Sequence, residues 1–197
     1  METVPNFFIS NLFFDDVFLI KPKKFKDNRG LFYESFKKSF FLKKFGFEII
    51  QENTSISAVN VLRGLHFQVN PFSQSKLISV TRGKILDVIV DIKRNSSTYR
   101  KWFSYTLDSK NNEQILIPQG YAHGFLSLCN DTQISYKVDS AYDPKSERTI
   151  IWNDEDLRID WPTNNPIISV KDLSGKTFLE NEIEGNFDFM PRNFINE

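Results

Sequence analysis

The sequence has little of several features that would place it in a particular class of protein. Its 197 residues contain one cysteine, Cys129, so no disulfide can form within the chain, and a reducing cytoplasm fits this usage. Lysine and arginine number 25 and are balanced by 25 acidic residues, which leaves a formal net charge of zero. This balance excludes the broad positive field of nucleic-acid and anionic-membrane binders, so a site for an anion must be local.

Long apolar runs and clustered histidines are missing as well. No stretch approaches the roughly 20 apolar residues of a membrane span, and the N-terminus has no basic region followed by an apolar stretch, so we expect a cytoplasmic protein without membrane contact. The two histidines, His66 and His123, form no HxH pair, and there is no second cysteine. Because zinc and iron sites usually need three or more protein ligands, we expect no metal site.

Phenylalanine, in contrast, is abundant, with 20 residues, several of them near the N-terminus. The short apolar pieces at 6–9 and 16–20 predict edge strands there. The rings in this region could close a barrel or cover a partner subunit: Phe7, Phe8, Phe13, Phe14 and Phe18.

From residue 77 onward, short strand patterns recur with turn residues between them. The predicted strands are 77–82, 84–92, 101–107, 114–117, 121–129 and 133–139. No helix long enough for a parallel crossover separates them, so the series predicts an all-β sandwich or barrel. The length favours a single domain over 1–197.

The remaining segments are more varied. Residues 26–30 form a turn before an alternating strand at 31–36, and the segment 37–46 predicts a short helix that ends at Gly46. Residues 47–50 read as extended, and 51–55 read as a polar stretch. We expect the tail from about residue 183 to be a loop or short helix over the barrel.

The segment Leu62–Gln68, LRGLHFQ, organises the functional prediction. In a regular strand Arg63 and His66 would face opposite sides, so they share a site only if Gly64 bends or bulges the backbone. A cation and an imidazole in one concave space would bind an anion and move a proton. The alternative is a core strand whose histidine is simply hydrogen-bonded.

Asp87 interrupts the apolar run 85–90, where a buried carboxylate without a partner would be costly. It either faces outward on a half-exposed strand or is a pocket carboxylate that pairs with a histidine or a lysine. His123 enters a predicted strand shortly after the turn at 118–120.

Other polar residues also allow two interpretations. Tyr136 and Tyr142 are either packing residues or a phenolic acid and a stacking platform. Lys76 opens a predicted strand and could be a solvated lysine. Together with Arg29 and Arg63 it could instead hold a pyrophosphate, since arginine presents a planar donor fork to phosphate oxygens.

Seven segments between about Asp27 and Gly175 carry a family resemblance: DNRGLFYESF, QENTS, VLRGLHFQ, SKLISVTRGKILDVIVDI, IPQGYAHGF, YKVDSAYDPKSER and IWNDEDLRIDWP. Together, and in this order, they resemble the dTDP-4-dehydrorhamnose 3,5-epimerase family. The resemblance implies a cupin-type jelly-roll barrel with short peripheral helices, a homodimer, and no metal or organic cofactor. It also implies a nucleoside-diphosphate sugar substrate, dTDP with a 4-keto-6-deoxyhexose, whose C3 and C5 are inverted.

The same resemblance assigns roles to individual residues. His66 resembles the catalytic base, Asp172 the acid that orients it, and Tyr136 the proton donor on the opposite face. Lys76 matches the residue at the substrate carbonyl, and Tyr142 matches the ring that stacks on thymine. Asp87 matches a pocket carboxylate. The positions that match substrate contacts are Arg29, Glu34, Gln51, Asn53, Arg63, His123, Glu147 and Lys171.

Three positions depart from the family pattern: Thr54 replaces a frequent histidine, Ser75 a usual glycine, and Phe67 a frequent tyrosine. None belongs to the matched acid–base pair, although Ser75 could alter how the next residue, Lys76, is presented. The alternatives are an epimerase of C3 or C5 alone, a related 3,4-ketoisomerase, and a non-catalytic cupin that binds sugar nucleotides. The matches at Tyr136 and Asp172 argue against the ketoisomerase.

Overall fold

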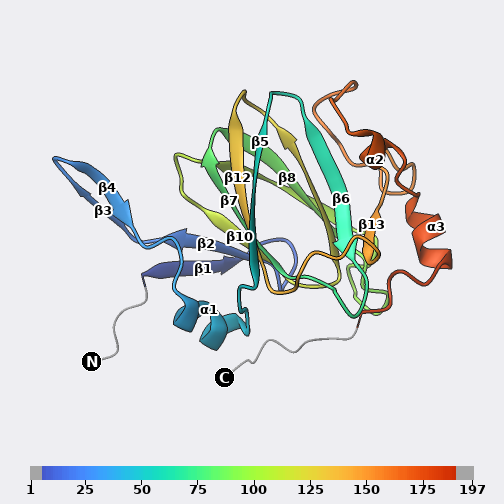
Figure 1. Ribbon diagram of the computed structural model, residues 1–197, viewed down its shortest axis with the longest axis horizontal. Coiled ribbons are helices and arrows are strands. Elements are labelled where there is room, and N and C mark those ends of the chain that lie inside the picture. The colour runs from blue at the N-terminus through green and yellow to red at the C-terminus, as the bar shows by residue number, and fades with distance from the viewer. Residues whose placement is uncertain (1–5, 190–197) are drawn as a thin grey trace.

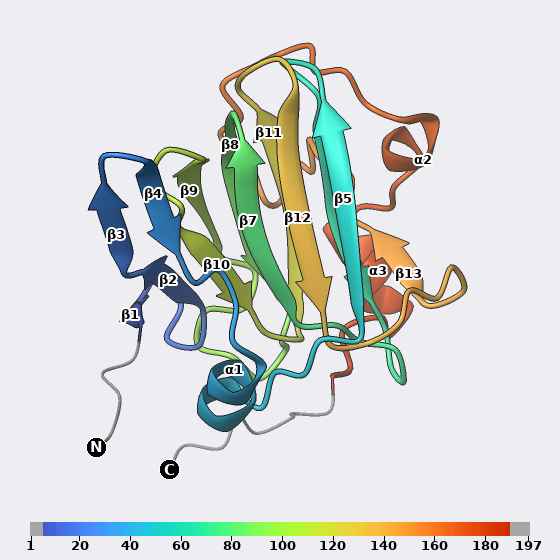
Figure 2. The ribbon, with the colours of Figure 1, turned by 60° about the vertical axis from the view of Figure 1, so that its left-hand side comes forward.

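Two antiparallel β-sheets packed face to face make up the body of the protein, in a computed structural model that describes residues 6–189 (Figures 1 and 2). The six-stranded sheet has the spatial order β1 (Phe7–Asn11), β2 (Phe18–Pro22), β10 (Gln114–Ile117), β7 (Lys76–Arg82), β12 (Thr132–Val138) and β5 (Gln51–Ser57). The five-stranded sheet has the order β13 (Glu147–Thr149), β6 (Leu62–Gln68), β11 (Tyr121–Ser127), β8 (Lys84–Asp91) and β9 (Trp102–Asp108). The all-β jelly-roll prediction is confirmed.

A hairpin and three short helices complete the described chain. The hairpin β3 (Lys24–Asp27) and β4 (Gly30–Tyr33) projects from one side of the barrel (Figure 1). The helices are α1 (Lys38–Phe45), α2 (Val170–Leu173) and α3 (Phe178–Ile183). Helix α1 ends at Gly46, which has a φ of +63°, as the sequence predicts.

The strand predictions from residue 77 onward agree with β7 to β12 to within about two residues at each boundary. The polar stretch at 51–55 was interpreted wrongly, because it belongs to β5. This strand lies at the edge of its sheet, with one face toward solvent and the other toward a polar part of the space between the sheets. It therefore lacks the apolar alternation that marks most strands.

The space between the sheets is apolar in one part and polar in another. Apolar side chains from both sheets fill the first part, among them Ile78, Val80, Ile85, Ile89, Phe125 and Ile134. Because side chains alternate along a strand, Lys76, Asp87, His123 and Tyr136 share the inner face with these residues on β7, β8, β11 and β12. The outward-facing interpretation of Asp87 is thus wrong, and this residue is fully buried.

Strand β6 has the bulge that its sequence allows. From Arg63 to His66 the strand advances three residues, while its partner β11 advances two, from Phe125 to His123. Gly64 occupies the bulge with a φ of +119°, and a Cβ there would lie 2.5 Å from the Cα of Gly124. Only glycine fits this position.

The outer faces of both sheets are partly covered. Phe41 and Phe45 of α1 pack with Phe7 over the six-stranded sheet. Trp161, Phe178 and Phe187 from the C-terminal region cover the five-stranded sheet. Of the N-terminal rings, Phe7 and Phe14 are buried, whereas Phe8 and Phe13 are exposed.

Of the tail predicted from about residue 183, residues 190–197 lie outside the described part. Within the described residues, no helix is both long and apolar enough for a membrane span.

Candidate active site

A histidine–aspartate pair lies on the inner side of β6. His66 Nε2 is 2.7 Å from Oδ1 of Asp172, and the backbone N–H of Gly64 donates to the other oxygen at 3.4 Å. Asp172 is in the first turn of α2, whose N-cap Ser169 accepts a hydrogen bond from the Asp172 backbone N–H. The pair therefore joins a strand to a helix that lies 106 residues further along the chain.

The ionisation of Asp172 determines which nitrogen of His66 is basic. Burial alone would raise the pKa of the Asp172 carboxyl, but the hydrogen bond and charge of His66 outweigh it and hold the pKa below its usual value. An ionised carboxylate only accepts hydrogen bonds, so Nε2 of His66 carries a proton, and Nδ1 is the nitrogen that accepts a proton when the ring is neutral. The imidazole is 27% exposed, so other groups can reach it.

A second pair lies nearby on β8 and β11. His123 Nε2 is 2.7 Å from Asp87 Oδ1, and both side chains are almost completely buried. The other oxygen of Asp87 is buried and has no hydrogen-bond partner among the described residues. The prediction that this carboxylate pairs with a histidine agrees with this geometry.

Lys76 reaches across from the six-stranded sheet to the five-stranded one. Its ammonium donates a hydrogen bond of 3.0 Å to the backbone carbonyl of His66. Burial lowers the pKa of Lys76 to about 8, and the negative charges of Glu147 and Asp87 limit the decrease. The ammonium of Lys76 thus contacts the backbone of His66 in the first pair, and the charge of Asp87 in the second pair raises its pKa.

Tyr136 lies on β12, in the sheet that faces β6. Its ring is 6.4 Å from that of Phe125 across the inter-sheet space, and its hydroxyl is 2.9 Å from Ser55 Oγ. Burial raises the pKa of Tyr136, against the opposing effects of the Ser55 hydrogen bond and the Arg63 charge. At the β5 edge, Arg63 Nε donates to Ser57 Oγ at 3.3 Å, so it links the two sheets as well.

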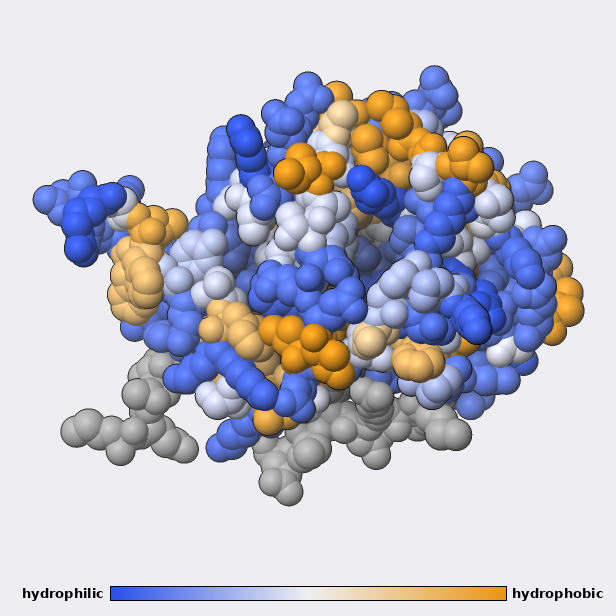
Figure 3. Space-filling model, viewed as in Figure 1, coloured by the Kyte–Doolittle hydropathy of each residue, from blue (hydrophilic) through white to orange (hydrophobic). Residues whose placement is uncertain are grey.

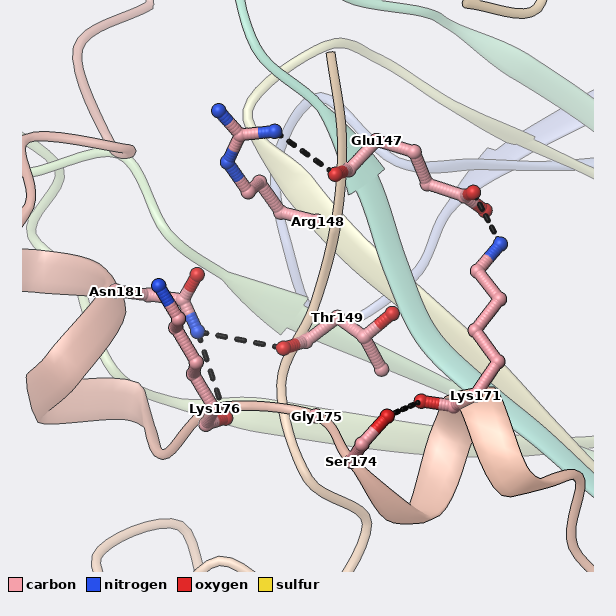
Figure 4. Close-up of a pocket in the computed structure, with 8 residues that line it drawn as sticks. All are labelled: Glu147, Arg148, Thr149, Lys171, Ser174, Gly175, Lys176 and Asn181. Atoms are coloured by element: carbon pink, nitrogen blue, oxygen red, sulfur yellow. Dashed lines mark hydrogen bonds and ion pairs between the residues drawn. The ribbon is translucent and has the colours of Figure 1, made fainter. Parts of the chain in front are cut away.

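Three further candidate residues, Tyr142, Glu147 and Lys171, bond to one another beside β13 and α2, and Figure 4 shows the bond between Glu147 and Lys171. Glu147 accepts hydrogen bonds from the hydroxyl of Tyr142, at 2.8 Å, and from the ammonium of Lys171. Burial would raise the pKa of Glu147, but these donors and the charge of His66 hold it below its usual value. A cavity of about 150 Å³ lies beside this bridge, between β13 and the α2–α3 connection.

The face of the molecule in Figure 3 is hollowed near its centre, at the interval between β5 and β6 in Figure 1. Gln51 and Asn53 lie on β5 at this edge. They bond to each other at 2.8 Å, and Gln51 Oε1 also accepts the Tyr142 backbone N–H at 3.0 Å. Ser55 lies on the same strand face, and sequence reasoning missed it. The alternation of Gln51, Asn53 and Ser55 was the signal that could have found it.

Two candidates do not lie with the others. Arg29, in the turn of the β3–β4 hairpin, forms an ion pair with Asp27 at 2.5 Å, and Glu34 accepts a hydrogen bond from Asn6. The hairpin lies on the other side of the barrel from β6, β13 and α2 (Figure 1). Within one chain, these two residues are therefore remote from His66.

The groups near His66 do not resemble a metal site. Among residues 6–189, no cluster of three or more histidine, cysteine, aspartate or glutamate side chains is arranged to hold an ion. What the structure places on the inner faces is an accessible imidazole on one sheet, and a partly buried ammonium and a phenol on the facing sheet.

Comparison with known proteins identifies the family. A sequence model described as dTDP-4-dehydrorhamnose 3,5-epimerase matches residues 11–180. The dTDP-4-dehydrorhamnose 3,5-epimerase of Escherichia coli is 45% identical over 161 residues, which are 80% of this chain and 87% of that protein. The chain belongs to the dTDP-4-dehydrorhamnose 3,5-epimerase family. It is accordingly an isomerase.

Solved structures of the epimerase family match this fold closely. The dTDP-6-deoxy-D-glucose-3,5-epimerase of Legionella pneumophila, in complex with dTDP-4-keto-L-rhamnose, has a TM-score of 0.87 and 37% identity, covering 94% of this chain and 100% of that one. A 3′-monoepimerase from Streptomyces bikiniensis, in complex with dTDP-quinovose, has a TM-score of 0.83 and 31% identity, covering 89% and 90%.

The departures from the epimerase pattern lie away from the His66–Asp172 pair. Thr54 is exposed on the outer side of β5, and Phe67 packs in the apolar cluster outside the five-stranded sheet. Ser75 is buried, and its backbone N–H donates to Asp139 Oδ1 at 2.7 Å. This bond holds the chain immediately before Lys76.

Proposed function

We propose that the protein converts dTDP-4-dehydro-6-deoxyglucose to dTDP-4-dehydrorhamnose by inverting C3 and C5. Both carbons are alpha to the C4 ketone, so either hydrogen can be removed to give an enolate. Membership of the 3,5-epimerase family supports this activity. The single observation that carries the mechanism is that the imidazole of His66 lies on the inner face of one sheet, while the facing sheet carries the phenol of Tyr136 and the ammonium of Lys76, which bonds to the His66 carbonyl.

In this proposal His66 removes the proton through Nδ1. Asp172 holds Nε2–H, fixes the tautomer and stabilises the imidazolium that forms. The exposure of the imidazole allows contact with the sugar, and the low pKa of Asp172 keeps the carboxylate ionised throughout.

Lys76 stabilises the enolate. Negative charge develops on the C4 oxygen when the proton leaves, and a buried ammonium interacts more strongly with this charge than a hydrated one would. Because its pKa is about 8, Lys76 is mostly charged at neutral pH.

Tyr136 completes each inversion. A carbon that is deprotonated on one face must receive its new proton on the other face, and Tyr136 lies on the sheet opposite His66. Its raised pKa keeps the phenol protonated and ready to donate.

The remaining candidates bind the nucleotide sugar. Arg63 provides a donor fork for the pyrophosphate, and the exposed ring of Tyr142 offers a stacking surface for thymine. Asp87 and His123 bind and orient the sugar from within the barrel. The others are proposed as polar contacts at the rim: Gln51, Asn53, Glu147 and Lys171.

We also propose that the protein acts as a homodimer. Phe25, Leu31 and Phe32 are exposed on the projecting hairpin, and covering them would require another chain. A second copy would also bring Arg29 and Glu34 close to the partner's site. Sedimentation of the wild type and of Phe32→Asp tests this, because a wild-type monomer contradicts the proposal. Cofactor-independent catalysis, which the family resemblance implies, and a cytoplasmic location, which the single cysteine favours, belong to the same proposal.

The decisive experiment is product NMR after incubation of the keto-sugar nucleotide with the protein in deuterated water. Deuterium at both C3 and C5, with inversion at both, is the expected result. Nucleotide-sugar binding without deuterium uptake would instead establish a non-catalytic binding protein.

The second candidate function is an epimerase that inverts one carbon only. The similarity to the Streptomyces bikiniensis 3′-monoepimerase supports this candidate. The same spectrum separates the two candidates, since a single-centre enzyme inverts only C3 or only C5. Activity that survives exhaustive chelation supports the metal-free mechanism, and activity restored only by added metal contradicts it.

A further inference from the structure

The hydroxyl of Tyr136 has one hydrogen-bond partner among the residues that the structure describes. This partner is Ser55, whose Oγ lies 2.9 Å away on the neighbouring strand β5, and either oxygen can be the donor.

The pairing of β5 with β12 explains this contact. Asn53 is directly opposite Tyr136, and Ser55 is opposite Ile134, one step along the same face. Diagonal neighbours in an antiparallel pair lie within reach of a long side chain, so the phenol extends to the Ser55 hydroxyl. Thr54, between Asn53 and Ser55, points to the opposite side of the sheet.

The inversion step would leave a charge on Tyr136 that its contact with Ser55 can stabilise. When Tyr136 donates its proton to carbon, a phenolate remains in a site where burial disfavours charge. The Ser55 hydroxyl can rotate to donate to this phenolate, since a hydroxyl acts as donor or acceptor. Ser55 is itself only partly buried, so solvent can reach it.

We propose that Ser55 is the positioning residue of Tyr136, holding the phenol in place and relaying its replacement proton from solvent. The proton balance is complete. Tyr136 loses a proton to carbon, Ser55 passes its proton to the phenolate oxygen, and water restores the proton of Ser55. The proton taken by His66 returns to water. This inference rests on the proposed epimerase function and extends it to a residue outside the acid–base set.

Ser55→Ala should separate proton removal by His66 from reprotonation by Tyr136. His66 acts from the other sheet, so deuterium exchange into the substrate should stay within about threefold of the wild-type rate. Net inversion should slow by about 10- to 100-fold, the effect of losing a hydrogen bond to a charged group. KM should change little, because Ser55 is not proposed to bind substrate.

Two matched variants complete the experiment. Ser55→Thr restores a hydroxyl and should recover inversion to within about threefold of wild type. Thr54→Val changes the adjacent residue on the outer face and should leave both rates unchanged. Thermal unfolding and dTDP binding of each variant report whether it is folded.

Equal losses of exchange and inversion in Ser55→Ala, or wild-type inversion in this variant, would overturn the role of Ser55. Failure of Ser55→Thr to recover inversion while it remains folded would overturn it too. If wild type and Thr54→Val take up no deuterium at all, the proposed function itself fails. A failure confined to the Ser55 variants leaves that function intact.

Discussion

Two histidine–aspartate pairs, whose histidines lie on the inner face of the same sheet, have the same Nε2–Oδ1 distance of 2.7 Å, yet their surroundings differ. The side chains of His66 and Asp172 are 27% and 5% exposed, whereas those of His123 and Asp87 are 5% and 0% exposed. A base must reach the substrate and then release its proton. Accessibility, rather than the pairing distance, therefore distinguishes the candidate base from the candidate orienting pair.

Removal of each imidazole in turn should give the largest difference between the two pairs. His66→Ala should lower deuterium exchange and product formation by about 10³- to 10⁴-fold, because general-base catalysis is lost. His123→Ala should retain measurable exchange, since its imidazole does not take the proton. NMR in deuterated water measures both variants, and dTDP binding is the control for folding. Exchange at the wild-type rate in His66→Ala would show that the base is assigned wrongly.

Asp172→Asn is expected to have the next largest effect. The amide cannot stabilise an imidazolium and can leave His66 in the wrong tautomer, so kcat should fall by about 10²-fold. KM and dTDP binding should change little. Single-turnover measurements of product formation test this, with Ser174→Ala on the same segment as a control. A wild-type kcat in Asp172→Asn would remove Asp172 from the proposed mechanism.

The comparison also shows which parts of the site could be read from the sequence. Asp87 stood out as a polar residue in an apolar run, but the sequence left open whether it faces outward or into a pocket, because apolar residues occupy both sides of the strand at 85–90. Its pairing with a histidine was one of the two interpretations, and Gly64 suggested the bulge that turns Arg63 toward the face of His66. These are local signals, and the structure agrees with them.

Other parts depend on contacts that no local pattern encodes. Asp172 reaches His66 from a helix of four residues, and only the family resemblance suggested that pair. Strand β5 was missed because polar residues occupy both of its faces at a sheet edge. The positions of Arg29 and Glu34 relative to the site depend on a projecting hairpin, whose neighbours one sequence does not specify.

A smaller effect, on stability rather than catalysis, should distinguish Asp87 from Asp172. Asp87→Asn replaces a fully buried oxygen that has no partner among the described residues with an amide NH2 group, whose N–H donors also need partners. We expect the free energy of unfolding to fall by about 1–3 kcal/mol, the penalty of a buried unsatisfied donor. Asp172→Asn should cost less, because its site is adjacent to the accessible imidazole. Urea unfolding of both variants measures the difference, and equal losses would contradict this distinction.

The smallest effect is a shift in a pH profile that depends on Lys76, whose ammonium bonds to the His66 carbonyl and responds to the charge of Asp87. Its ammonium must be charged to stabilise the enolate, so kcat/KM should fall as the pH rises through about 8, by tenfold per pH unit beyond it. In Lys76→Arg this decrease should disappear below pH 10, because a guanidinium stays charged. The negative charge of Asp87 raises the pKa of Lys76, so Asp87→Asn should move the decrease to lower pH by a fraction of a unit. Initial rates from pH 6 to 10 measure all three proteins. A decrease that persists unchanged in Lys76→Arg would assign it to another group, and an unshifted decrease in Asp87→Asn would mean that the buried pair does not act on Lys76.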